Sequence, residues 1–115
     1  MTPSAEWRCA VADLAPGTSA KFRLARGTRS VEGFIVHVDG RYHAYVNTCP
    51  HVGTPLDLWP NEFFDADGRT LICSMHGAYF APDTGRCIAG PCAGDSLETL
   101  AVRRDGDAIV VTWPG

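Results

Sequence analysis

The stretch FIVHVDGRYHAYVNTCPHVG, residues 34–53, decides the fold. Two apolar runs, residues 34–38 and 42–46, flank the dipeptide Asp39-Gly40. This dipeptide favours a two-residue hairpin turn, because such a turn needs positive φ at both of its central positions. The sequence therefore predicts an antiparallel hairpin here, and the hairpin leads directly into a segment rich in possible metal ligands.

Similar turn signals divide the rest of the chain into short strands, and no long segment has a helical period. We therefore predict an all-β fold with antiparallel pairing. The further turns are Asp67-Gly68 before residues 70–72, Asp83-Thr84-Gly85 after residues 78–80, and Asp105-Gly106 between residues 100–103 and 108–112.

Length and charge narrow the range of functions. With 115 residues the chain is expected to form a single domain over residues 1–115. The net charge is −3 and the basic residues are scattered, so the sequence predicts neither a nucleic-acid nor a membrane-surface partner. No apolar run approaches the roughly 20 residues that span a bilayer, and the first residues lack the pattern of a signal peptide. We expect a cytoplasmic protein.

Four of the possible metal ligands fall in two short motifs, Cys49-Pro50-His51-Val52-Gly53 and Cys73-Ser74-Met75-His76-Gly77. Each motif offers one thiol and one imidazole, followed by a glycine that lets the backbone turn tightly. Each also begins just after a predicted strand, so the two loops can converge at the ends of neighbouring hairpins. The five cysteines are odd in number, which favours a metal site over a disulfide framework.

Two kinds of metal site are compatible with these ligands. Two Cys and two His form a tetrahedral zinc site in many proteins, but zinc motifs usually pair like ligands within one loop. Here each loop pairs unlike ligands, which suits a dinuclear iron centre. Cys49 and Cys73 would then hold one iron, and His51 and His76 the other.

The Cys-x-His and Cys-x2-His motifs, each closed by glycine, resemble those of the Rieske family. The resemblance extends to Ala78-Tyr79-Phe80, Thr84-Gly85 and Gly90-Pro91. It implies one [2Fe–2S] cluster held by two cysteines and two histidines. It also implies a Rieske-type antiparallel β-sandwich or barrel base, with a small cluster-binding subdomain over about residues 46–94 that presents two loops at hairpin ends.

The resemblance further implies a free-standing ferredoxin that carries single electrons from a reductase to a terminal oxygenase or another acceptor. The sequence has no flavin or nicotinamide fingerprint, so we expect an electron-transfer protein, not an enzyme, with no small-molecule substrate of its own. High-potential members of the family carry a disulfide and two hydroxyl donors around the cluster. Thr54, Met75, Ala78 and Phe80 occupy those places, which predicts the lower part of the Rieske range of about −150 to +300 mV.

Two other functions stay open, a cluster-bearing accessory subunit of a larger reductase, of the nitrite-reductase small-subunit type, and a redox sensor that uses Cys87 and Cys92. Those two cysteines can also simply pack near the cluster. The remaining candidates have structural interpretations: Cys9 as a buried small residue, His37 and His43 as surface or hydrogen-bonded strand residues, and Trp59, Phe63 and Phe64 as either a docking patch or a small local core.

Overall fold

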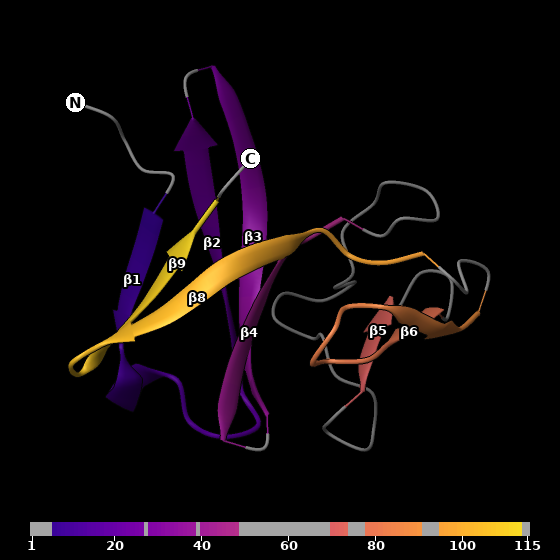
Figure 1. Ribbon diagram of the computed structural model, residues 1–115, viewed down its shortest axis with the longest axis horizontal. Helices are drawn as coiled ribbons and strands as arrows, with labels where there is room; N and C mark the ends of the chain where they lie inside the picture. The colour runs from indigo at the N-terminus through magenta and orange to yellow at the C-terminus, as the bar shows by residue number, and fades with distance from the viewer. Residues whose placement is uncertain are drawn as a thin grey trace.

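The computed structural model describes residues 6–26, 28–38, 40–48, 70–73, 78–90 and 95–113, with Arg26 and Cys73 described by their backbone alone. Within these ranges the chain forms nine strands and one short 3-10 helix, and the strands make two antiparallel sheets (Figure 1). The prediction of an all-β, antiparallel fold is thus confirmed. The described residues contain no helix of the length and apolar character that crossing a bilayer requires.

The larger sheet has six strands in the order β1-β9-β8-β4-β3-β2, and the smaller has three in the order β5-β6-β7. The six strands are β1 (Glu6–Ala10), β2 (Ser19–Arg26), β3 (Arg29–Val38), β4 (Arg41–Val46), β8 (Thr99–Asp105) and β9 (Ala108–Thr112). The short helix η1 (Val11–Asp13) follows β1. The three strands are β5 (Leu71–Cys73), β6 (Ala78–Phe80) and β7 (Cys87–Ala89).

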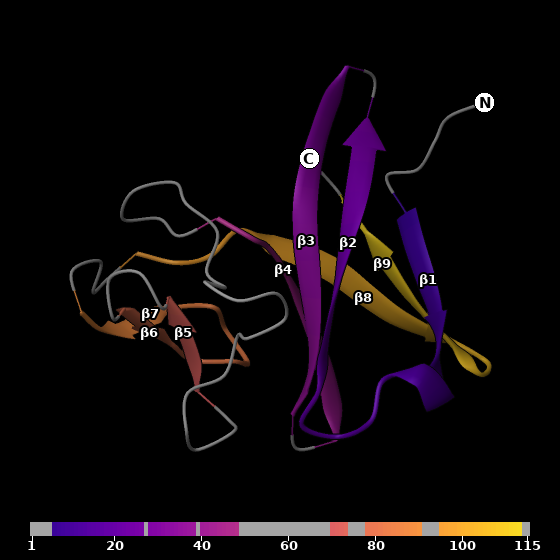
Figure 2. The same cartoon turned by 180° about the vertical axis from the view of Figure 1, so that it is seen from behind.

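The larger sheet curls into a nearly closed barrel. Figures 1 and 2, taken from opposite sides, show β8, β9 and β1 along one wall and β2 and β3 along the other. The two edge strands meet where Trp7 of β1 stacks on Phe22 of β2, with ring centroids 4.6 Å apart and planes inclined by 17°. Such stacking buries aromatic surface across the gap that the backbone hydrogen bonds leave open.

Three of the four predicted turns connect strands as expected, and the fourth, Asp67-Gly68, lies outside the described residues. Strands β3 and β4 pair with Val38 opposite Arg41, so Asp39-Gly40 is the two-residue connection, and Gly40 has a φ of 77°. The last hairpin joins β8 to β9 with Asp105 opposite Ala108. Glycines supply the positive φ that these turns need, at little conformational cost.

Strand β2 was missed by the sequence analysis, and β3 begins at Arg29, earlier than predicted. Strand β2 reads SAKFRLAR, in which buried Phe22 and Leu24 alternate with polar residues. This is a half-buried strand whose apolar signal rests on two side chains. Its pairing with β3 along the whole strand stabilises it, and that pairing is not visible in a local window.

The interior of the barrel holds one of two apolar cores and is narrow. A Cβ atom built on Gly33 of β3 would lie 2.5 Å from Cε1 of Phe22 and 2.9 Å from Cδ1 of Leu100. Glycine at this position therefore leaves room for the side chains of Phe22, its partner on the neighbouring strand β2, and of Leu100 on β8. The buried residues of this barrel core are Leu14, Phe22, Leu24, Ile35, Ala44, Val46, Leu100, Ile109, Val111 and Trp113.

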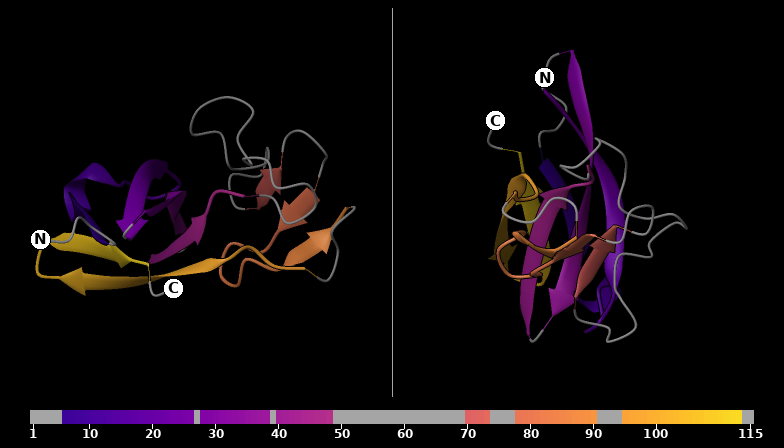
Figure 3. Two further views of the ribbon diagram at one scale, coloured as in Figure 1. Left: turned by 90° about the horizontal axis from the view of Figure 1, so that it is seen from above. Right: turned by 90° about the vertical axis from the view of Figure 1, so that its right-hand side faces the viewer.

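The second core lies between the barrel and the smaller sheet, which packs against the side of the barrel (Figure 3). Strand β3 explains why: Ile35 points into the barrel, while Phe34, Val36 and Val38 point outward and are equally buried. The sequence of a strand that is buried on both faces is a continuous apolar run, without alternation of polar and apolar residues. The other members of this interface core are Tyr45, Leu71, Ala78, Phe80, Cys87 and Leu97.

Candidate metal centre

The structure describes the strands that carry the two ligand motifs more fully than the motifs themselves. Cys49, His51 and His76 lie outside the described residues, and Cys73 is the last residue of β5. The ligand set therefore stays a prediction at this point. What the structure adds is how the chain is held immediately before and after each motif.

The second motif connects two paired strands. Strands β5 and β6 run antiparallel with Leu71 opposite Phe80 and Cys73 opposite Ala78. Residues 74–77, which include His76, are the connection between them. Leu71, Ala78 and Phe80 are fully buried in the interface core, so both strands that bear this motif are fixed to the side of the barrel.

The chain is also held where it enters the first motif. Strand β4 ends at Val46, and the next residue, Asn47, is buried with 3% exposure. The Asn47 backbone N–H donates to the carbonyl oxygen of Glu32 at 2.8 Å, and its side-chain amide donates to the Glu32 carboxylate at 2.9 Å. The N–H of Thr48 then donates to the Val46 carbonyl at 2.9 Å, which closes a three-residue turn directly before Cys49.

Sequence reasoning did not identify Asn47 and Glu32. A polar residue directly after a buried apolar strand was the available signal, because a buried amide needs hydrogen-bond partners. Glu32 is one strand away, and its carboxylate also lies 3.9 Å from the Lys21 ammonium group. This partly buried cluster fixes the end of β4 to β3 at the point where the chain leaves the barrel.

Two positions near the second motif bear on the reduction potential. Ala78 and Phe80 are both fully buried in the interface core, and neither side chain carries a hydroxyl group. Hydrogen-bond donors to a cluster or its sulfur ligands raise the potential, because they stabilise the extra negative charge of the reduced state. Thr54 and Met75, the other two positions from which the sequence predicts a low potential, lie outside the described residues.

The two strand histidines have the structural surroundings that the sequence analysis favoured. His37 is buried, with Nδ1 2.9 Å from the Leu14 carbonyl oxygen and its ring 4.3 Å from that of Tyr42. His43 is half-buried, and burial lowers its pKa. The nearby Asp83 carboxylate opposes this lowering of the pKa, and Arg41 adds to it.

Two cysteines outside the motifs are also placed. Cys9 lies on β1 and is half-buried against the barrel core; burial, with a contribution from Asp13, raises the pKa of its thiol. Cys87 is 2% exposed in the interface core, and its thiol contacts the Ala89 carbonyl oxygen at 3.3 Å. Cys92, Trp59, Phe63 and Phe64 lie outside the described residues. Within the described ranges, no group of three or more His, Cys, Asp or Glu side chains could hold a metal ion.

Comparison with known proteins gives a family match over most of the chain. The Rieske [2Fe-2S] domain family matches residues 5–113. Curated proteins yield no match.

Several solved structures are similar to the chain. The ferredoxin of carbazole 1,9a-dioxygenase from Nocardioides aromaticivorans IC177 aligns with a TM-score of 0.70 and 25% identity, covering 93% of this chain and 96% of that one. A chain from the complex of reduced oxygenase and oxidised ferredoxin in carbazole 1,9a-dioxygenase aligns with a TM-score of 0.73 and 23% identity. This alignment covers 95% of this chain and 94% of that one. The terminal oxygenase of carbazole 1,9a-dioxygenase from Novosphingobium sp. KA1 aligns with a TM-score of 0.72 and 19% identity, covering 96% of this chain and 30% of the oxygenase chain. The last two likenesses concern the fold.

Proposed function

The chain belongs to the Rieske [2Fe-2S] domain family, and on that premise we propose that it carries electrons from a reductase to a terminal oxygenase. Membership implies one Rieske-type [2Fe–2S] cluster, and the match to a ferredoxin over nearly its whole length makes the chain an electron-transfer protein and not an enzyme. The observation that carries the proposal is the match to a ferredoxin of an oxygenase system, which covers 93% of this chain and 96% of that one.

Cys49, His51, Cys73 and His76 are the proposed ligands of the cluster, with the cysteines on one iron and the histidines on the other. The donor set fits, because two thiolates and two imidazoles are the ligands of a Rieske centre. The pairing of β5 with β6 supports the second half of the set, because it places Cys73 at the start of a short connection that contains His76. The anchored end of β4 supports the first half, since Cys49 follows two residues after Asn47.

When bound, the cluster supplies a site that accepts and releases one electron. The residues of this chain set how readily it does so. Two thiolates cancel the +2 charge of the oxidised core, whereas four would leave a net charge of −2, so an added electron costs less here than in a four-cysteine centre. Ala78 and Phe80 offer no hydroxyl donor, and we therefore place the midpoint potential in the lower part of the Rieske range.

The chain is further proposed to act as a single domain in the cytoplasm, with residues 46–94 as its cluster-binding part. The half-buried Cys9, a free thiol, supports a reducing compartment, because small exported proteins usually pair their cysteines.

Potentiometry combined with a transfer assay tests this function. The purified protein should titrate as a one-electron centre between about −150 mV and zero. Once reduced, it should be reoxidised in stopped-flow mixing with a terminal oxygenase from the same host, while the Cys73→Ser variant should transfer no electrons. A midpoint well above zero would refute the assignment of the low range. A reduced cluster that the oxygenase does not reoxidise would refute the proposed acceptor.

A further inference from the structure

Tyr45 is placed where the two ligand-bearing parts of the chain meet. It lies on β4, four residues before Cys49, and is only 2% exposed. Its side chain is part of the interface core, together with Leu71 and Ala78 from the two strands that flank the second motif. One side chain therefore belongs to the strand that enters the first motif and packs among the residues that support the second.

The contacts of Tyr45 reach across to the smaller sheet. Its hydroxyl donates a hydrogen bond of 2.7 Å to the carbonyl oxygen of Pro82, in the turn that follows β6. The edge of its ring faces Gly85 of the same turn, where an added Cβ would lie 2.7 Å from Cε1 of Tyr45. Gly85 also has a φ of +74°, so both its backbone conformation and its closeness to the ring require glycine.

The turn that receives this hydrogen bond is itself well fixed. The N–H of Gly85 donates to the Ala81 carbonyl at 2.8 Å, and the N–H of Ala81 donates to the Arg86 carbonyl at 2.9 Å. The N–H of Leu97 donates to the Gly85 carbonyl at 2.8 Å, which ties the turn to the segment entering β8. A displacement of Pro82 is therefore carried into β6, whose first residue is Ala78, the partner of Cys73.

We propose that Tyr45 is a positioning residue that sets the separation of the two ligand motifs through its hydrogen bond to Pro82. The inference rests on the proposed ligand set. One cluster must take ligands from both motifs, and the iron–ligand distances leave little tolerance for a shift of one motif relative to the other. The hydroxyl remains a donor throughout neutral pH, because burial and the Asp83 carboxylate raise the pKa of Tyr45.

A buried tyrosine can also act only as core packing, and the Tyr45→Phe variant separates the two roles. It keeps the ring and its apolar contacts, and it removes only the hydroxyl group that reaches Pro82. Tyr42→Phe is the matched control: Tyr42 lies on the same strand, faces the opposite side and packs its ring on His37.

The experiment compares three properties of the two variants with those of the wild type, all with the cluster loaded. These are the line shape of the EPR spectrum of the reduced protein, the midpoint potential, and the rate at which a chelator removes iron. Tyr45→Phe should show broadened g features, a shifted midpoint and iron release roughly tenfold faster, since the partly buried Pro82 carbonyl loses its donor. Tyr42→Phe should match the wild type in all three properties.

A second variant keeps the test decisive if Tyr45→Phe does not fold. Gly85→Ala keeps the Tyr45 hydroxyl but forces the ring and the turn apart, so it should change the same three properties in the same direction. If the folded variants lose thermal stability while their EPR line shape, midpoint and iron release remain those of the wild type, Tyr45 is core packing and the inference is wrong. A wild-type protein without a Rieske EPR signal would instead refute the proposed function itself.

Discussion

The barrel and the three-stranded sheet differ in how much core each possesses. The barrel strands are five to ten residues long and surround an apolar core of their own. Strands β5, β6 and β7 have three residues each, and their buried side chains share one core with residues of β3 and β4. Strands this short are not stable by themselves, so the smaller sheet depends on the outer face of the barrel.

This difference suggests a division of roles. A region with few buried contacts of its own opens locally at lower free energy than the rest of the protein. The second ligand motif lies in that region, and a bound cluster would link it to the first motif at the end of β4. We therefore expect the barrel to stabilise the fold and the cluster to stabilise the smaller sheet.

Removal of a proposed ligand should produce the largest effect and the sharpest contrast between the two regions. We expect Cys73→Ser to abolish the cluster, since a hydroxyl is a poor replacement for a thiolate ligand. In hydrogen exchange, amides of β3, β4 and β9 should keep their protection. The protection factors of amides in β5 and β6 should fall at least about tenfold. Cys9→Ala, which removes a cysteine packed on the barrel, should leave both the cluster and the exchange pattern unchanged. An equal loss of protection in the barrel of Cys73→Ser would contradict the division of roles.

A matched pair of core truncations compares the two regions directly. Leu24 in the barrel and Leu71 in the interface core are both fully buried, and each change to alanine should cost about 2–5 kcal/mol. In Leu24→Ala, far-UV circular dichroism and cluster absorbance should fall together at a lower temperature. In Leu71→Ala, cluster absorbance should be lost well before the strand signal. Coincident transitions in Leu71→Ala would show that the two regions unfold as one unit.

His43 lies on the outer face of β4 beside Asp83, at the junction of the two regions. We expect this histidine to have a smaller effect on stability, and one that depends on pH. Folding lowers the pKa of His43, so its stabilising contribution is complete above the unfolded pKa of about 6.5 and is lost as the pH falls through the lower, folded value. We expect the wild type to lose more thermal stability than His43→Gln between pH 7.5 and pH 5.5. An equal loss in both proteins would mean that His43 does not contribute.

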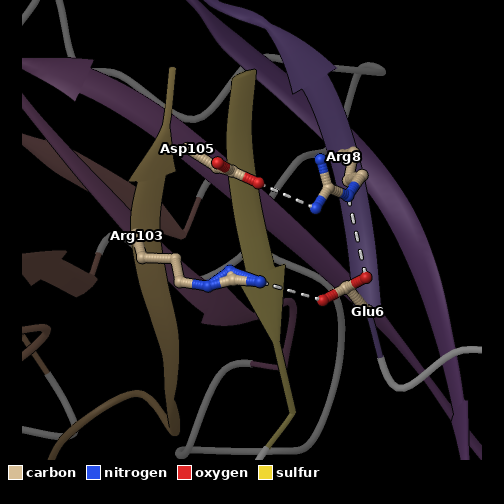
Figure 4. A network of polar contacts seen from close by, with 4 residues as sticks. All are labelled: Glu6, Arg8, Arg103 and Asp105. Carbon is tan, nitrogen blue, oxygen red and sulfur yellow. Dashed lines mark hydrogen bonds and ion pairs between the residues drawn. The ribbon is translucent and has the colours of Figure 1, made fainter. Parts of the chain in front are cut away.

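The charged network that joins β1 to β8 on the barrel surface should matter least (Figure 4). Glu6 lies 3.7 Å from Arg8 and 3.4 Å from Arg103, and Arg8 lies 3.1 Å from Asp105. These side chains are 43–59% exposed, and exposed ion pairs contribute between zero and about 1 kcal/mol. Glu6→Gln should therefore change the denaturation midpoint little and leave the reduction potential unchanged. A shifted potential would reveal a coupling that the structure does not explain.

Local signals allowed much of the fold to be predicted from the sequence. Asp39-Gly40 and Asp105-Gly106 identified two hairpins, because a short turn with positive φ has few compatible residues. The pairing of β4 with β8, with Ala44 opposite Leu100, was not predictable, because it joins residues far apart in the chain. The burial of β3 on both faces was missed for the same reason, since its outer cover comes from β5, β6 and β7.

The candidate metal centre divides in the same way. The four ligands were proposed from two short motifs. Each motif is five residues long, so its spacing and residue types can be recognised locally. The strands around those motifs are fixed by hydrogen bonds of Asn47, Glu32 and Tyr45. Each of these residues bonds to a partner on another strand or turn. Nothing near Tyr45 in the sequence indicates that its hydroxyl reaches Pro82, because that contact spans 37 positions of the chain.

EPR spectroscopy of the dithionite-reduced protein tests directly whether the chain binds a Rieske cluster. We expect a rhombic signal with an average g value below that of four-cysteine clusters, and about two iron atoms per chain. This signal should disappear when any one of the four proposed ligands is replaced: Cys49, His51, Cys73 or His76. A colourless wild-type protein that contains stoichiometric zinc and gives no such signal would contradict the presence of a Rieske cluster.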